Sequence, residues 1–402
     1  MKLDATGDNA MRSIPGALWG YGFRPFFLGA GALAVLLIPW WAAAVAWRVP
    51  LGSAWPPALW HGHEMLFGFI GAAIAGFLLT AVPSWTGERG FAGWPLVALA
   101  ALWALGRVAV ATSGAWPPVW VAAADAAFLP SLAALIAPSL TRARNRNTPL
   151  LGVLAALWAV NVAFYWGLWH GDAAFARHAL YIGIDIVLLL VTVVGGRIIP
   201  AFTSAALKQQ GIPTPVYAWR SVTPLAIAAM AALTLVDLFR LESALAGAVA
   251  ALAAVIQAIR LAQWQSLRTY RMPIVWVLHL GYLWLVLGLA LKALALLADV
   301  GFAHFYLHAL TIGAAGTMIV AVMTRASLGH TGRPLRVTHS TMWAYGLLTA
   351  AAATRVFGPE LLPMAYTQVV LLAGGLWTAA FVLFLGVYAP ILLSPRADGK
   401  PG

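Results

Sequence analysis

Two pairs of histidines are the residues of this sequence best suited to chemistry. His61 and His63 stand in the segment Trp-His-Gly-His-Glu, and His304 and His308 are four residues apart. Neutral imidazole is the ligand type shared by haem iron, copper and zinc. Residues four apart lie on one face of a helix, and the flexible Gly62 lets the first pair converge. Each pair therefore predicts a metal or haem site.

The remaining histidines are interpreted one by one. An isolated histidine near a membrane interface is more often hydrogen-bonded than a ligand, and this is the expectation for His170, His279, His330 and His339. His178 differs because it aligns with one histidine of each pair, His63 and His308, in an internal repeat described below. It is therefore a further candidate metal ligand.

The elements that must position these histidines are membrane helices. The chain has 402 residues, of which 62% are hydrophobic and 9% charged, and its mean hydropathy is +0.86. A soluble domain cannot bury so much apolar surface. The sequence has no cysteine, which excludes iron–sulfur clusters, covalent haem attachment and thiolate copper sites. The fold class is thus predicted as an all-α polytopic membrane bundle, a single integral membrane domain over residues 1–402.

Apolar runs of about 18 residues or more predict twelve transmembrane helices. Strands are not expected, because the runs are too long for barrel strands and lack their alternation. The expected spans are 26–48, 59–82, 92–112, 116–138, 148–170, 175–199, 219–239, 242–262, 274–298, 303–325, 338–357 and 363–392.

The positive charges predict the orientation of these spans. Most lysines and arginines lie in the N-terminal segment and in every second loop, whereas the opposite loops hold only Arg48, Arg177, Arg240 and Arg355. Positively charged loops stay in the cytoplasm, so both termini are expected there. The net charge of +12 is therefore a sign of membrane orientation, and no nucleic-acid partner is expected. This orientation gathers most of the histidines, including both pairs, at the outer face.

An internal repeat places a histidine at the same depth in three segments. His63-Glu-Met-Leu-Phe-Gly, His178-Ala-Leu-Tyr-Ile-Gly and His308-Ala-Leu-Thr-Ile-Gly are each separated by four predicted spans. Such repeats arrange equivalent positions around a shared centre. They suggest three units of four helices, over residues 23–140, 148–262 and 274–392.

Arg107 and Lys292 lie inside predicted spans and need partners there. Arg107 and Lys292 could bind the propionates of a haem. Asp125 and Asp185 are equally suitable partners for them, or could orient the ligand histidines. The sequence leaves both roles open.

Seven segments of the chain match the motifs of a known family: 22–27, 60–65, 76–83, 85–87, 195–203, 308–311 and 321–333. Through them the chain resembles the NnrS-type membrane proteins of the bacterial nitric-oxide response along nearly its whole length. Gly62 is a departure, since the family is expected to have alanine there, but both neighbouring histidines are kept. The resemblance implies a twelve-span protein of the bacterial inner membrane that contains haem and copper and protects against nitrosative stress.

Subunit I of the haem–copper oxidases is similar in a looser way. It has twelve spans in three four-helix arcs, with haem ligands on spans two and ten, where this chain has His63 and His308. His178 on span six falls where that superfamily places a copper ligand. Span seven (219–239) contains no histidine, so a complete oxidase-type binuclear centre is not expected.

The leading hypothesis is that His63 and His308 ligate a haem b that binds or converts nitric oxide. His61, His304 and His178 would hold copper beside it. Whether nitric oxide is reduced, scavenged or sensed is left open, and reduction would need an external electron donor such as a quinol. The alternative is a secondary transporter that uses intramembrane charges for coupling. A purely structural or assembly role would leave the outer histidines unexplained.

Overall fold

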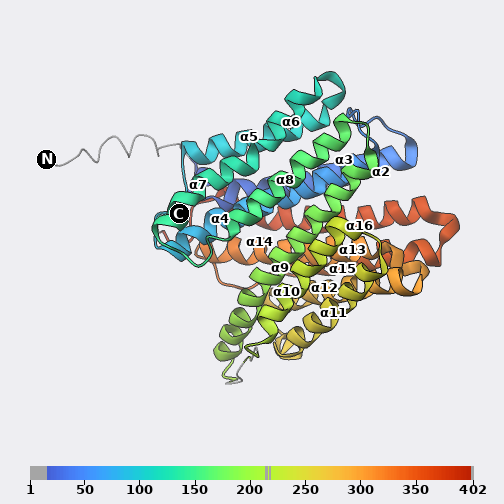
Figure 1. Ribbon diagram of the computed structural model, residues 1–402. Coiled ribbons are helices and arrows are strands. Elements are labelled where there is room, and N and C mark those ends of the chain that lie inside the picture. Colours follow the sequence, from blue (N-terminus) through green and yellow to red (C-terminus); the bar gives the residue numbers. More distant parts are fainter. Residues whose placement is uncertain (1–15, 213–215, 217–218, 400–402) are drawn as a thin grey trace. The chain divides into compact units, whose positions relative to one another are not determined.

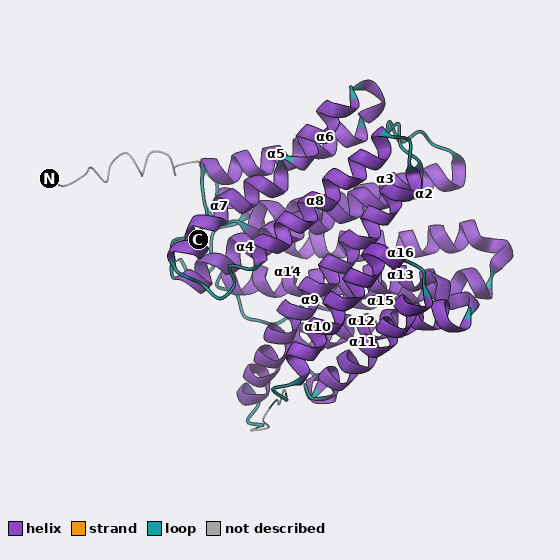
Figure 2. Cartoon of the chain, in the orientation of Figure 1, coloured by secondary structure: helices purple, strands orange, loops and turns teal. Residues whose placement is uncertain are grey.

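The apolar runs of the sequence form helices. The structure is a computed structural model that describes residues 16–212, 216 and 219–399. All regular structure in these residues is helical, and mostly short loops join the helices (Figures 1 and 2). A helix satisfies its own backbone hydrogen bonds, as a segment inside a bilayer must. The predicted all-α membrane bundle is therefore confirmed.

The chain divides into two compact units built from segments distant in sequence. Unit 1 extends to Leu180 and adds Arg325–Leu335 and the segment from Phe384 onwards, and unit 2 comprises Tyr181–Thr324 and Arg336–Leu383. The helices of unit 1 are α2 (Phe23–Trp47), α3 (Pro57–His63), the π-helix η2 (Glu64–Ile70), α4 (Gly71–Thr86), α5 (Trp94–Ala111), α6 (Pro118–Ala126), α7 (Phe128–Arg142) and α8 (Leu150–Trp169).

Unit 2 contains a second set of helices, and three of the four boundaries between the units fall inside helices. Those three helices are α9 (Ala173–Gln209), α14 (Thr317–His330) and α16 (Tyr366–Leu393). The helices of unit 2 are α10 (Val222–Arg240), α11 (Ala244–Ala262), α12 (Pro273–Ala298), the 3₁₀ turn η5 (Gly301–Phe305), α13 (Tyr306–His308), the π-helix η6 (Ala309–Gly316) and α15 (His339–Leu361). Further 3₁₀ turns are η1 (Ala17–Trp19), η3 (Ser113–Ala115), η4 (Ser266–Thr269) and η7 (Pro363–Ala365).

Within the described residues, 11 helical segments are long and apolar enough to cross a membrane. The remaining predicted span, 338–357, lies in α15, which has 23 residues but is less apolar because serine and threonine interrupt its alanines. The chain is thus a multi-pass membrane protein. The three predicted four-helix repeats remain a prediction.

Local sequence signals explain where the helices begin and end. Proline occupies the first position of α3, α6 and α12, where its missing N–H costs nothing. Ser243 caps α11 by accepting a hydrogen bond from the N–H of Ala246 (3.1 Å). Gly87 ends α4 with φ of 72°, a conformation that favours glycine.

One helix is longer than the sequence predicts. The span expected to end at residue 199 continues as α9 to Gln209, so about half of the expected loop 200–218 is helical. Pro200 lies inside the helix, and the hydroxyl of Thr203 donates to the carbonyl of Ile199 (2.8 Å). The first strong helix terminator after it is Gly211, which has φ of +73°.

Candidate functional site

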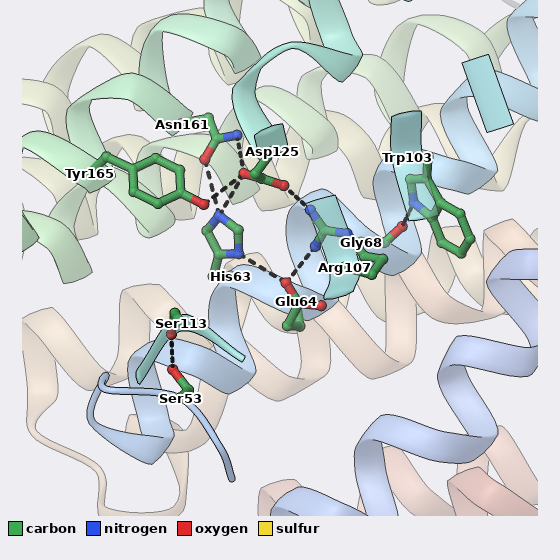
Figure 3. A network of polar contacts seen from close by, with 10 residues as sticks. All are labelled: Ser53, His63, Glu64, Gly68, Trp103, Arg107, Ser113, Asp125, Asn161 and Tyr165. Atoms are coloured by element: carbon green, nitrogen blue, oxygen red, sulfur yellow. Dashed lines mark hydrogen bonds and ion pairs between the residues drawn. The ribbon is translucent and has the colours of Figure 1, made fainter. Parts of the chain in front are cut away.

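The polar cluster of unit 1 surrounds His63, at the junction of α3 and η2. We call it the histidine–arginine cluster, and it comprises His63, Glu64, Arg107, Asp125, Asn161 and Tyr165. Figure 3 shows these side chains pointing toward one another from four parts of the unit. The π-helix η2 begins at Glu64, directly after the histidine. Wide turns of this kind often occur at functional sites.

Arg107 on α5 joins the two carboxylates of this cluster. Its guanidinium donates to Glu64 on one side and to Asp125 of α6 on the other. All three residues are at most 8% exposed. Burying a charge is costly unless it is paired, and the guanidinium supplies the positive charge that both carboxylates share. The structure pairs Arg107 with Asp125, and the predicted binding of a haem propionate by Arg107 stays a prediction.

Both ring nitrogens of His63 face acceptors. Nδ1 lies 3.2 Å from Glu64 Oε1, and Nε2 lies 3.1 Å from Asn161 Oδ1 and 3.2 Å from Asp125 Oδ2. The ring itself is fully buried. A ligand imidazole turns one nitrogen to the metal and the other to a hydrogen-bond acceptor. Ligation by His63 would therefore require one of these contacts to be exchanged, and its role as a haem ligand stays a prediction.

Helix α8 completes the cluster through two residues on one face. The amide of Asn161 donates to Asp125 Oδ2 (2.8 Å), and the hydroxyl of Tyr165 donates to the same oxygen (3.0 Å). Residues four apart on a helix point the same way, so α8 presents both groups to one carboxylate. The cluster is thus a closed hydrogen-bonded network.

The other predicted ligands of unit 1 lie outside this network. The ring of His61 stacks on Trp41, with the ring centroids 4.2 Å apart. His178 is half-buried on α9. The predicted roles of these two histidines in copper binding stay predictions.

Unit 2 contains a partly open cavity of about 470 Å³. We call it the histidine cavity, because His304 of η5 and His308 of α13 both line it. Arg355 of α15 and Glu242, which lies between α10 and α11, add charge of both signs. The remaining lining residues are Tyr181, Leu296, Phe305, Tyr306 and Leu307. The structure therefore places both histidines of the second pair at one cavity, but His304 lies in a 3₁₀ turn and not on the helix face that the spacing predicts.

Two polar side chains that line the cavity, His304 and Arg355, also contact other residues of unit 2. His304 is exposed, and its Nε2 lies 2.8 Å from Asp299 Oδ1. Arg355 donates to the hydroxyl of Tyr366 (3.0 Å), and its guanidinium carbon lies 5.5 Å from the centroid of the Phe305 ring. Directly after His308 the chain enters the π-helix η6. Both repeat segments that begin with His63 and His308 thus continue as π-helices.

Three buried charged residues lie in the same unit as the cavity. We call Asp185, Asp237 and Lys292 the aspartate–lysine triad. Lys292 of α12 donates to Asp237 of α10, and Asp185 of α9 interacts with both. The Lys292 ammonium also lies 5.6 Å from the centroid of the cavity residue Tyr306. The binding of haem propionates by Lys292 stays a prediction, since its nearest group in the structure is a carboxylate.

The described residues contain no cluster of three or more histidine, aspartate or glutamate side chains arranged to hold a metal ion. Of the predicted metal ligands, the histidine cavity brings together two, His304 and His308. Two of the isolated histidines are hydrogen-bonded, as expected. His279 lies 2.9 Å from the hydroxyls of both Thr203 and Ser266, and His170 Nδ1 lies 2.9 Å from the carbonyl oxygen of Trp166.

Sequence reasoning did not identify Arg355, Tyr165 or Tyr306 as site residues. In the sequence Arg355 is an outer loop charge, and no histidine lies near it that would mark it as a site residue. Tyr165 could have been found from its spacing of four from Asn161. Tyr306 carries no such signal, because aromatic residues are common throughout membrane helices.

The chain matches the model of a known protein family. The family model described as NnrS protein matches residues 17–396. A search of the curated proteins finds no match. The matched region spans both units, so it includes the histidine–arginine cluster, the histidine cavity and the aspartate–lysine triad.

Proposed function

Since the chain belongs to the NnrS family, we propose that it acts in the nitric-oxide response by binding nitric oxide at a haem b in the histidine cavity, with copper nearby. Family membership supports the role in the nitric-oxide response. The haem, the copper and the location of the site are our own extension. The observation that carries this extension is that His304, His308 and Arg355 line one cavity.

The donor set of the cavity suits these cofactors. His308 and His304 supply imidazoles, which bind haem iron and copper. Arg355 supplies a planar guanidinium, which matches the carboxylate of a haem propionate. The rings of Tyr181, Phe305 and Tyr306 offer aromatic surface against which a flat macrocycle can pack. A bound haem would supply an iron atom able to bind nitric oxide.

The cavity also suits a membrane-soluble gas. Nitric oxide is small and apolar, so it dissolves in lipid and can reach a site inside a membrane protein from the bilayer. The positive-inside rule places Glu242, His304 and Arg355 at the periplasmic end of their helices, with both termini in the cytoplasm of a bacterium. We therefore propose a periplasm-side site in the inner membrane.

An optical titration tests this proposal. Protein purified in detergent from haem-sufficient cells is reduced without oxygen, and nitric oxide is added while the haem absorption is recorded. We expect a haem band that shifts on addition of nitric oxide. The absence of haem absorption, or a haem band that does not respond to nitric oxide, would contradict the proposal.

A further inference from the structure

The aspartate–lysine triad is buried deep in unit 2 and contains more negative than positive groups. Asp185, Asp237 and Lys292 are 5%, 0% and 3% exposed. With both carboxyl groups ionised and the ammonium charged, the formal charges sum to −1. An uncompensated charge inside a membrane protein is expensive, so a neutral triad is strongly favoured. One added proton achieves this.

The contact between the two carboxyl groups shows where such a proton would lie. Asp185 is close enough to Asp237 and Lys292 to interact with both, and Lys292 donates to Asp237. Two ionised carboxylates in one buried site repel each other, so this arrangement favours a proton on one of them. The Oδ2 atom of Asp185 is buried without a hydrogen-bond partner. Such a position costs less for the carbonyl oxygen of a protonated acid than for a charged carboxylate oxygen.

The triad lies beside the histidine cavity. Tyr181 lines the cavity and precedes Asp185 by four residues on α9, so both point along one helix face. Tyr306 also lines the cavity, and its ring centroid lies 5.6 Å from the Lys292 ammonium. Tyr181 and Tyr306 are therefore the residues of the cavity wall that lie nearest to the triad.

We propose that the aspartate–lysine triad binds one exchangeable proton, shared by Asp185 and Asp237, and that Tyr181 connects this proton with the histidine cavity. Release of the proton leaves the triad with a charge of −1, and its return restores neutrality. No electron and no other atom moves. This inference goes beyond the proposed function, because the triad would hold its proton whether or not the cavity binds haem.

Infrared difference spectroscopy of the purified full-length protein tests the proton directly. A protonated carboxylic acid has a carbonyl band that shifts on transfer from H₂O to D₂O. We expect this band in the unsubstituted protein and its loss in Asp185→Asn and in Asp237→Asn. Each substitution removes one negative charge, so the remaining carboxylate pairs with Lys292 and needs no proton.

A third variant should change the band in the opposite direction. Lys292→Met removes the cation, so both carboxyl groups must be protonated to stay neutral, and the band from the triad should grow roughly twofold. Asp172→Asn, an exposed residue before α9, is the matched control and should leave the band unchanged. A band unaltered in both aspartate variants would overturn the proposal.

The rate of exchange of the carbonyl band into D₂O tests whether Tyr181 connects the proton with the cavity. Tyr181→Phe removes the hydroxyl on the cavity side of the triad and leaves the carboxyl groups in place. The band should then keep its intensity but exchange more slowly into D₂O than in the unsubstituted protein. Exchange at an unchanged rate would refute the role of Tyr181, while the spectra of the aspartate variants decide the proton itself.

Discussion

Two buried cations of this protein, Arg107 and Lys292, are paired with carboxylates on neighbouring helices. Arg107 contacts two carboxylates in unit 1, and Lys292 contacts one and interacts with a second in unit 2. The sequence showed that Arg107 and Lys292 lie inside spans but not which partner each has, because a partner on another helix depends on how the helices pack. Residue type and depth were predictable, and pairing was not.

Removing the cation of the histidine–arginine cluster should destabilise unit 1 strongly. Arg107→Met leaves Glu64 and Asp125 buried without their counter-charge, which costs about 3–5 kcal/mol. Unfolding by SDS in mixed micelles measures this free energy. A variant as stable as the unsubstituted protein would show that Arg107 does not compensate these carboxylates.

The exposed pair of Arg142 and Glu88 is the matched control. Hydrogen bonding from Ser139, and then the guanidinium of Arg142, hold the pKa of Glu88 below its usual value. Arg142 is largely solvent-exposed, and water screens exposed ion pairs. Arg142→Met should therefore change the unfolding free energy little in the same measurement.

At the scale of elements, close helix contacts hold the site residues in place. A Cβ at Gly106 of α5 would lie 3.0 Å from the Cα of Asp125 on α6, so the two backbones approach closely at this point. This contact brings Arg107, the next residue, to Asp125. The π-helices η2 and η6 that follow His63 and His308 had no signature in the sequence, because one additional residue in a turn leaves an apolar run unchanged.

A methyl group at Gly106 should therefore disturb the cluster. Gly106→Ala pushes α5 from α6 and should cost about 1–3 kcal/mol of unfolding free energy. Gly152→Ala in α8 is the control, because a Cβ there meets nothing within 4 Å. It should stabilise the protein by up to about 1 kcal/mol through helix propensity. Equal effects of the two substitutions would argue against the close contact.

At the scale of the whole molecule, the helical class was readable from hydrophobicity. Apolar runs such as 59–82 and 274–298 can only be buried as helices in a bilayer, so these spans were predicted correctly. The division into two units was not predicted. It depends on which helices pack together, as when segment 325–335 and the segment that begins at residue 384 join the N-terminal half of the chain. Hydropathy carries no information about such pairing.

The absence of cysteine makes the proposed orientation directly testable. Single cysteines replace two highly exposed residues of unit 2, Met364 between α15 and α16 and Leu267 between α11 and α12. A membrane-impermeant thiol reagent applied to spheroplasts should label Met364→Cys and leave Leu267→Cys unlabelled until the membrane is opened. The reverse pattern would contradict a periplasmic cavity.

A further substitution decides whether unit 1 contributes to the cofactor site. Both nitrogens of His63 are engaged by its own unit, so we expect His63→Ala to lower stability while haem is retained by the folded protein. The ratio of haem to folded protein after size-exclusion chromatography measures this. Loss of haem from folded His63→Ala protein would instead support the haem shared by His63 and His308 that the sequence predicts.

The most direct test of the account is the haem-to-protein ratio of His308→Ala. The exposed His170, which lies at the end of α8 outside both sites, provides the control as His170→Ala. We predict that His308→Ala protein, purified in folded form, loses its haem, whereas His170→Ala protein keeps it. Full haem content in both His308→Ala and His304→Ala would contradict the assignment of the cofactor to the histidine cavity.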